Sequence, residues 1–128
     1  MSYLIDTITF LWFITDHAGL SSHAENLIQQ PDNPIYLSVG SIWEMSIKVS
    51  LNRLEMPTPF NEFIDSQLIG NRIALLPIRS EHAAKLISLP FHHQDPFDRL
   101  LVAQALHEGY TLISKDEVFD TYGVNREW

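Results

Sequence analysis

The sequence predicts an α/β fold, with one domain that holds a central parallel β-sheet of four to five strands flanked by helices on both faces. Short apolar runs alternate along the chain with segments of helical periodicity, a pattern typical of βαβ units. The length of 128 residues suits a single domain that buries about two-thirds of its unfolded surface. No repeat or linker interrupts the pattern, so residues 1–128 are expected to fold as one unit.

The first three elements follow from apolar runs and one capping residue. Residues 3–6 form a short apolar run closed by an acid, which predicts a buried strand. Residues 9–14 are almost wholly apolar and predict a helix. Ser21 or Ser22 can cap a further helix that ends at the residue before Pro31.

A second strand is expected at residues 35–38, after a turn made of Asp, Asn and Pro. The helix that follows has two possible starts. If Ser41 is its cap, Glu44 completes a capping box and binds back to the Ser41 amide. If Ser38 is the cap, Glu44 lies a turn and a half into the helix and is free to reach a metal ion. The pattern leaves both alternatives open.

The middle of the chain predicts a helix, a strand and a second helix. Pro59 can start a helix that runs through Ile69 and stops at Gly70. Residues 72–76 form a third strand, and residues 80–89 show helical spacing. This order continues the strand and helix alternation of the first half.

The last third contains the longest predicted helix. Asp95 suits the cap and Pro96 the first helical position, and Gly109 ends the helix after Glu108. Residues 110–114 predict a fourth strand, and residues 124–128 a fifth at the edge of the sheet.

Four acids lie where strands end or helices begin, namely Asp6, Glu44, Asp98 and Asp116. In a parallel sheet these ends share one edge, where ligands bind. Carboxylates gathered there repel each other unless a cation neutralises them, and an oxygen-only cluster suits Mg²⁺ or Mn²⁺. For Asp98 alone, an acid that complements the helix dipole is the plainer interpretation. The expected proximity of Asp98 to the other three acids favours a metal site instead.

Several other polar residues have defined expectations. Lys48, Arg99 and Lys115 are candidates for binding phosphate groups, and Ser38 and Ser114 for orienting ligands or water. Thr7 offers a hydroxyl that can support a neighbouring ligand. The remaining residues near the acids have plainer interpretations: a helix cap for Asp95, an exposed position for Asp120, and a solvated loop rather than a zinc site for His92-His93.

Composition limits the classes of function. The formal net charge of −8 argues against a passive nucleic-acid coat, which needs a basic face. An acidic protein can still process nucleic acid when metal ions cancel local charge, or it can bind a basic protein partner. There is no Cys, and the longest apolar run, residues 8–14, is too short to span a bilayer. We expect a cytoplasmic protein without a membrane segment or a signal peptide.

Taken together, these residues resemble a PIN domain, specifically the toxin of a VapBC-type toxin–antitoxin pair. The resemblance covers nearly the whole chain. Its segments are, in order, Leu4-Ile5-Asp6-Thr7, Leu11-Trp12, Leu37-Ser38, Ser41-Ile42-Trp43-Glu44-Met45-Ser46-Ile47-Lys48, Leu89-Pro90 through Asp95-Pro96-Phe97-Asp98-Arg99-Leu100-Leu101-Val102-Ala103-Gln104-Ala105, Leu112-Ile113-Ser114-Lys115-Asp116 and Tyr122-Gly123-Val124.

The resemblance implies a Mg²⁺- or Mn²⁺-dependent endoribonuclease in which Asp6, Glu44, Asp98 and Asp116 match the family's acidic quartet. It also implies a cognate antitoxin that binds across the active site, and a homodimer. Two alternatives come from other classes. A phosphotransfer enzyme also uses acids at a sheet edge, although it usually has a second acid beside the first, where Thr7 and Ile8 stand here. A non-catalytic interaction domain would not depend on Asp6.

Overall fold

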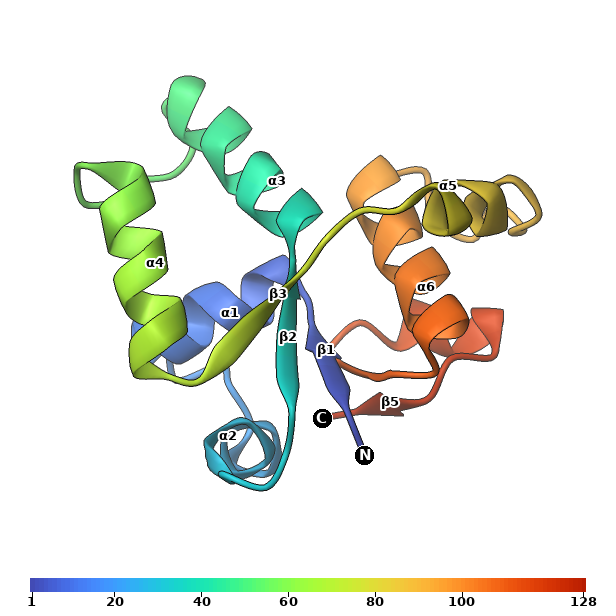
Figure 1. The fold of residues 1–128 in the computed structure, drawn as a ribbon, viewed down its shortest axis with the longest axis horizontal. Helices are drawn as coiled ribbons and strands as arrows, with labels where there is room; N and C mark the ends of the chain where they lie inside the picture. Colours follow the sequence, from blue (N-terminus) through green and yellow to red (C-terminus); the bar gives the residue numbers. More distant parts are fainter.

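A five-stranded parallel sheet organises the fold, in the order β3-β2-β1-β4-β5 (Figure 1). The computed structural model describes residues 1–128. The strands are β1 (Tyr3–Ile5), β2 (Ile35–Ser38), β3 (Ile73–Leu76), β4 (Thr111–Ile113) and β5 (Arg126–Glu127). The predicted α/β class is confirmed, and the fifth strand lies at the edge of the sheet as expected.

Helices cover both faces of this sheet. They are α1 (Thr7–Ile14), α2 (Ser22–Gln29), α3 (Val39–Ser50), α4 (Phe60–Gly70), α5 (Ser80–Ile87), α6 (Pro96–Glu108) and the 3₁₀ helix η1 (Glu117–Tyr122). In Figure 1, α1, α2 and α4 lie on one side of the strands, and α5 and α6 on the other. Helix α3 follows β2 and contacts both α1 and α6. None of these helices has the length and apolar character needed to cross a bilayer.

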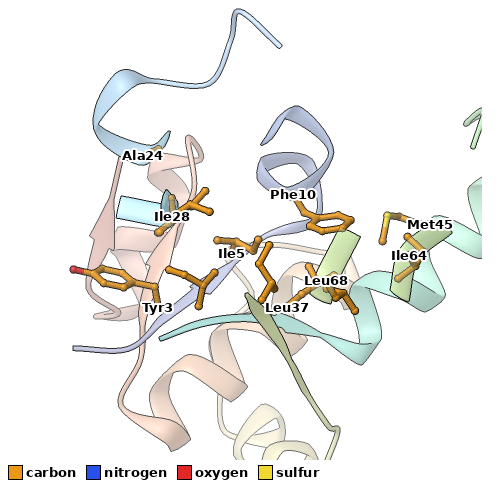
Figure 2. Packing of buried hydrophobic residues seen from close by; sticks show 12 residues of the cluster. Tyr3, Ile5, Phe10, Ala24, Ile28, Leu37, Met45, Ile64 and Leu68 are labelled. Carbon is orange, nitrogen blue, oxygen red and sulfur yellow. The ribbon is translucent and has the colours of Figure 1, made fainter. Parts of the chain in front are cut away.

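Two hydrophobic clusters fill the space between the helices and the sheet. Successive strand residues point to opposite faces, so Ile5 belongs to one cluster and Leu4 to the other. Figure 2 shows the first cluster, in which Ile5 and Leu37 pack with Phe10 of α1 and other helix residues. The inner strands β1, β2 and β4 are buried on both faces, which explains why they read as continuous apolar runs.

Most element boundaries agree with the sequence, and the differences have local causes. Helix α1 begins at Thr7, two residues earlier than predicted, because Asp6 caps it. Gly70 does not end α4 as a left-handed residue; it is the last helical residue, and Arg72 takes the left-handed conformation with φ of 57°. Gly109 does end α6 in that conformation, with φ of 73°.

The start of α3 is settled in favour of Ser38. The Ser38 hydroxyl oxygen accepts from the Gly40 amide at 3.1 Å, as a helix cap does. Glu44 therefore lies in the body of the helix and does not bind back to Ser41. This places its carboxylate beyond the first turn, where it can extend away from the helix.

The strand order reverses direction between β1 and β4. From β1 the chain moves through β2 to β3 on one side, then crosses back to β4 on the other side of β1. In open parallel sheets, a crevice forms beyond the strand carboxyl ends at such a point. The residues that follow β1 and β4 are therefore the ones that the fold places at a binding crevice.

Candidate metal centre

Five acidic side chains line one cleft at the carboxyl edge of the sheet: Asp95 and the four expected metal ligands, each of those four from a different element. Asp6 follows β1, Asp116 follows β4, Glu44 lies in α3, and Asp98 lies in the first turn of α6. The cleft has a volume of about 400 Å³. Carboxylates that are distant in the sequence therefore face one shared space, as their positions at strand ends and helix starts predicted.

Asp6 is buried, and both of its carboxylate oxygens are held. Oδ1 accepts from the Thr9 amide at 2.9 Å, and Oδ2 accepts from the Ser114 hydroxyl at 2.5 Å. Burial raises the pKa of Asp6; hydrogen bonds from Ser114 and Thr9 lower it, and the charge of Asp116 adds a small rise. The side chain is thus fixed in orientation in surroundings that disfavour its negative charge.

Glu44 is held between two elements. The Thr7 hydroxyl donates to Oε1 at 2.6 Å, and the Lys48 ammonium, one turn along α3, pairs with Oε2 at 2.8 Å. The support expected from Thr7 therefore goes to Glu44. This contact joins the start of α1 to α3 and fixes the side of the cleft that Glu44 forms.

Asp98 carries the clearest electrostatic signal in the cleft. The pKa of Asp98 is raised to about 6, mainly by burial and in part by the charges of Asp95, Asp6 and Glu44, whereas His93 lowers it. Burial disfavours the charged form of a carboxyl group, and nearby negative charges add to that effect. The protein's own groups therefore stabilise the ionised form of Asp98 poorly.

Asp116 is the N-cap of η1, since its Oδ1 accepts from the Val118 amide at 3.0 Å. Its Oδ2 lies 2.8 Å from Nε2 of His93. One ligand-type atom from each of His93, Asp98 and Asp116 lies within 4.8 Å of the other two. Asp6 and Glu44 line the same cleft outside this group of three.

His93 was missed by the sequence reasoning. The expectation of a solvated loop fits the exposed His92, but it is wrong for His93, whose side chain is only 10% exposed. Neighbouring residues of an extended segment point to opposite sides, so one of a histidine pair can face inward. This alternation indicates that one of the two histidines faces inward. Which of the two faces the acids depends on how the loop packs.

Arg99 does not lie where the sequence suggested. It was a candidate for binding RNA phosphates, but it is 5% exposed. Its guanidinium donates to the carbonyl of Pro90 at 2.8 Å and to those of Leu86 and Leu89 at 3.4 Å, and it lies 4.0 Å from the ring centroid of Phe91. Arg99 therefore ties α6 to the segment that precedes it and is unavailable to a ligand.

The serine candidates divide in the same way. Ser38 is fully buried, and its hydroxyl oxygen is used in capping α3, so the structure contradicts a role in holding substrate. The Ser114 hydroxyl donates to Asp6, and its oxygen accepts from the Asp116 amide at 3.1 Å. Ser114 thereby orients two of the four acids, although its own burial keeps it from substrate.

The cations that remain at the cleft are few. Lys48 and Arg53 line it, and Lys115 is exposed beside it, with its ammonium 5.7 Å from the Trp12 ring centroid. Arg53 was not singled out in the sequence because it follows the end of α3 in a turn. These three cations at the rim, of which Lys48 is already paired with Glu44, suit contact with an anionic ligand.

Two further acids behave as the sequence predicted. Asp95 caps α6, because its Oδ1 accepts from the Phe97 amide at 2.8 Å. Asp120 is exposed and pairs with Arg126 at 2.9 Å.

The residues of the cleft fit a hard divalent cation. Their donor atoms are carboxylate oxygens, which Mg²⁺ and Mn²⁺ prefer. Burial raises the pKa of Asp6 and of Asp98, and neighbouring acids add to the rise, so a bound cation would favour the ionised forms of both. Thr7 donates to Glu44, and Ser114 donates to Asp6 and accepts from the Asp116 amide. Metal ligands in proteins are commonly held by such partners.

Comparisons with known proteins identify the fold and one curated relative. A profile of the PIN domain matches residues 3–125. Ribonuclease VapC22 of Mycobacterium tuberculosis is 27% identical over 116 residues, which are 88% of this chain and 85% of the relative. Among solved structures, VapBC2 from Rickettsia felis, bound to a DNA fragment from its promoter, aligns with a TM-score of 0.74 and 17% identity over 99% of this chain and 98% of the other. VapBC-1 from nontypeable Haemophilus influenzae aligns with a TM-score of 0.64 and 14% identity over 99% and 97% of the two chains. At these identities the structural matches establish the fold.

Proposed function

This chain belongs to the PIN-domain family, and we propose that it is a Mg²⁺- or Mn²⁺-dependent endoribonuclease that acts as the toxin of a toxin–antitoxin pair. The observation that carries the proposal is the convergence of four carboxylates in one cleft at the β1/β4 switch point. The similarity to the ribonuclease VapC22 supports RNA as the substrate.

In this proposal Asp6, Glu44, Asp98 and Asp116 hold the divalent ion. When bound there, the ion supplies positive charge that offsets the charge of a phosphodiester and favours the ionisation of water. Magnesium or manganese is the expected ion because the carboxylates supply oxygen ligands. Beside them, His93 places its imidazole Nε2 close to Asp116.

The protein's own groups have separate tasks. Ser114 holds Asp6 and Asp116 in place relative to each other, and Thr7 fixes the orientation of Glu44. Lys48, Arg53 and Lys115 bind RNA phosphates at the rim. Contacts of this kind position the RNA and do not depend on its base sequence. RNA binding should weaken as salt increases, and the dependence should be shallow, because it scales with the number of phosphates that these few cations contact.

RNA cleavage with and without Mg²⁺ tests the activity directly. The purified protein should cut a pool of cellular RNA at discrete positions in millimolar Mg²⁺ and stop cutting in EDTA. Primer-extension mapping of the new ends provides the measurement. Cutting that continues unchanged in EDTA would contradict the metal requirement. Rapid hydrolysis of phosphate monoesters with intact RNA would instead support the phosphotransfer class.

The proposed antitoxin should present a basic segment to this cleft. With a net charge of −8 and four clustered carboxylates, the cleft favours a partner that places Arg or Lys beside Asp6 and Asp98. Such a contact excludes metal and RNA together. The purified complex should therefore lose at least about 10-fold in cleavage rate, and release of the partner should restore it.

Two results would contradict this arrangement. A complex that retains full cleavage activity would show that the partner leaves the cleft open. A bound segment far from Asp6 and Asp98 in a structure of the complex would show that inhibition has another origin. The homodimer is part of the same proposal, and sedimentation of the free protein measures it.

A further inference from the structure

His93 occupies a position that packing alone does not explain. It lies in the segment between α5 and α6, and its ring is stacked on Tyr122, with centroids 5.6 Å apart and planes inclined by 6°. The other neighbour is Phe119, whose ring centroid lies 4.8 Å away. Between these rings the imidazole still directs Nε2 at a carboxylate of the candidate metal centre.

The hydrogen bonds around this ring determine where its proton lies. The His93 backbone amide donates to the Tyr122 hydroxyl oxygen at 2.7 Å. The hydroxyl proton is then free to be donated to Nδ1 of His93, 3.2 Å away. An ionised carboxylate only accepts hydrogen bonds, so the neutral His93 ring carries its proton on Nε2, which faces Asp116, and accepts at Nδ1. That proton is donated to Oδ2 of Asp116 at 2.8 Å.

Asp116 is consequently held from several directions. Its backbone amide donates to Ser114, its Oδ1 accepts from the Val118 amide, and its Oδ2 accepts from His93. Without the His93 contact, only the Val118 amide would hold the side-chain carboxylate, and its orientation would be less fixed. His93 is thus the contact from outside η1 that holds Oδ2 of Asp116 in place.

We propose that Tyr122 and His93 form a positioning relay that holds the Asp116 carboxylate in the orientation needed to bind a divalent ion. The inference rests on the proposed function, because it assigns a task within the same centre. His93 is a positioning residue here, acting through its Nε2 proton, and Tyr122 acts one step further out by fixing the ring. Partners of this kind change metal affinity about 10- to 100-fold when removed.

Mn²⁺ binding measured by calorimetry on the intact protein tests the relay without reference to catalysis. His93→Leu keeps an apolar contact with the aromatic rings and removes the donor, so affinity should fall about 10- to 100-fold. His93→Gln keeps a donor near the same position and should recover most of that loss. Tyr122→Phe keeps the ring stack and removes only the hydroxyl, so affinity should fall several-fold.

A matched control and a spectroscopic signature complete the test. Tyr110→Phe removes a hydroxyl from another stacked tyrosine, which lies against Tyr36 at the opposite end of β4, and should leave Mn²⁺ affinity unchanged. Imidazole ¹⁵N shifts of the metal-free protein should show His93 protonated on Nε2. In Tyr122→Phe the same shifts should show a mixture of tautomers.

The outcomes separate the relay from the proposed function. Tight Mn²⁺ binding by the parent protein together with unchanged affinity in His93→Leu and Tyr122→Phe would overturn the relay and leave the metal centre intact. Equal losses in His93→Leu and His93→Gln, with Tyr122→Phe unaffected, would also overturn it, because His93 would then be acting as a direct ligand. Failure of the folded parent protein to bind Mn²⁺ would overturn both.

Discussion

Replacing Asp6 by Asn is expected to lower Mg²⁺-dependent RNA cleavage by more than about 100-fold while the protein stays folded. Partners of metal ligands alone are worth about 10- to 100-fold, so a direct ligand should be worth more. Asn keeps a side-chain oxygen that can cap α1 and accept from Thr9, because Asn and Asp are equally good caps. Its amide can donate to the Ser114 hydroxyl oxygen. The change therefore removes charge from the cleft and little else.

Asp98→Asn should reduce cleavage to a similar degree, because Asp98 faces the same cleft from α6. Asp120→Asn is the matched control, since Asp120 is exposed and pairs with Arg126 outside the cleft. Cleavage rates at saturating Mg²⁺, with circular dichroism to check folding, give the comparison. A folded Asp6→Asn protein that cleaves RNA at the parent rate would remove Asp6 from the metal centre.

The fold could be predicted because its signals are local. Apolar runs of strand length, helix caps such as Asp95 and Ser21, and the stop at Gly109 each specify an element through nearby residues. Parallel pairing then follows from the alternation of strands and helices. The acids of the candidate site were predictable for the same reason, because a residue directly after a parallel strand must lie at the carboxyl edge.

Side-chain direction was less predictable because it depends on contacts distant in sequence. Arg99 follows Asp98 immediately, yet one side chain faces the cleft and the other is buried under Phe91. His93 meets Asp116 only because its loop folds back onto η1. The length of α3 did not reveal whether Ser38 or Ser41 caps it, since both have the sequence of a cap.

Divalent ions are expected to stabilise the folded protein markedly. A ligand that binds only the folded state adds about 2.7 kcal/mol to the free energy of unfolding at a hundredfold excess over Kd. The thermal midpoint should therefore rise in Mn²⁺ or Mg²⁺ and return to its starting value in EDTA. A midpoint that does not change at millimolar Mn²⁺ would count heavily against the metal centre.

The pH dependence of the metal-free protein follows from the burial of Asp98. Folding raises the pKa of Asp98 from 3.8 to about 6, mainly through burial, so the folded state favours its protonated form. The stability associated with this group is fully present below pH 4 and is lost as pH rises through 6. Metal-free protein should therefore become less stable across this window, as measured by denaturant unfolding at several pH values.

Asp98→Asn isolates this contribution. A shift of about two pKa units corresponds to about 3 kcal/mol, and solvent screening of a partly exposed group reduces it to about 1 kcal/mol. In EDTA at pH 7.5, Asp98→Asn should therefore be about 1 kcal/mol more stable than the parent, and the two should converge near pH 4. The variant should also show a smaller rise in thermal midpoint with Mn²⁺.

A helix-dipole role makes the opposite prediction for the stability of the metal-free protein, because losing negative charge at a helix start costs about 0.3–1 kcal/mol. A variant less stable than the parent at pH 7.5 would show that Asp98 serves α6 more than it serves a metal ion.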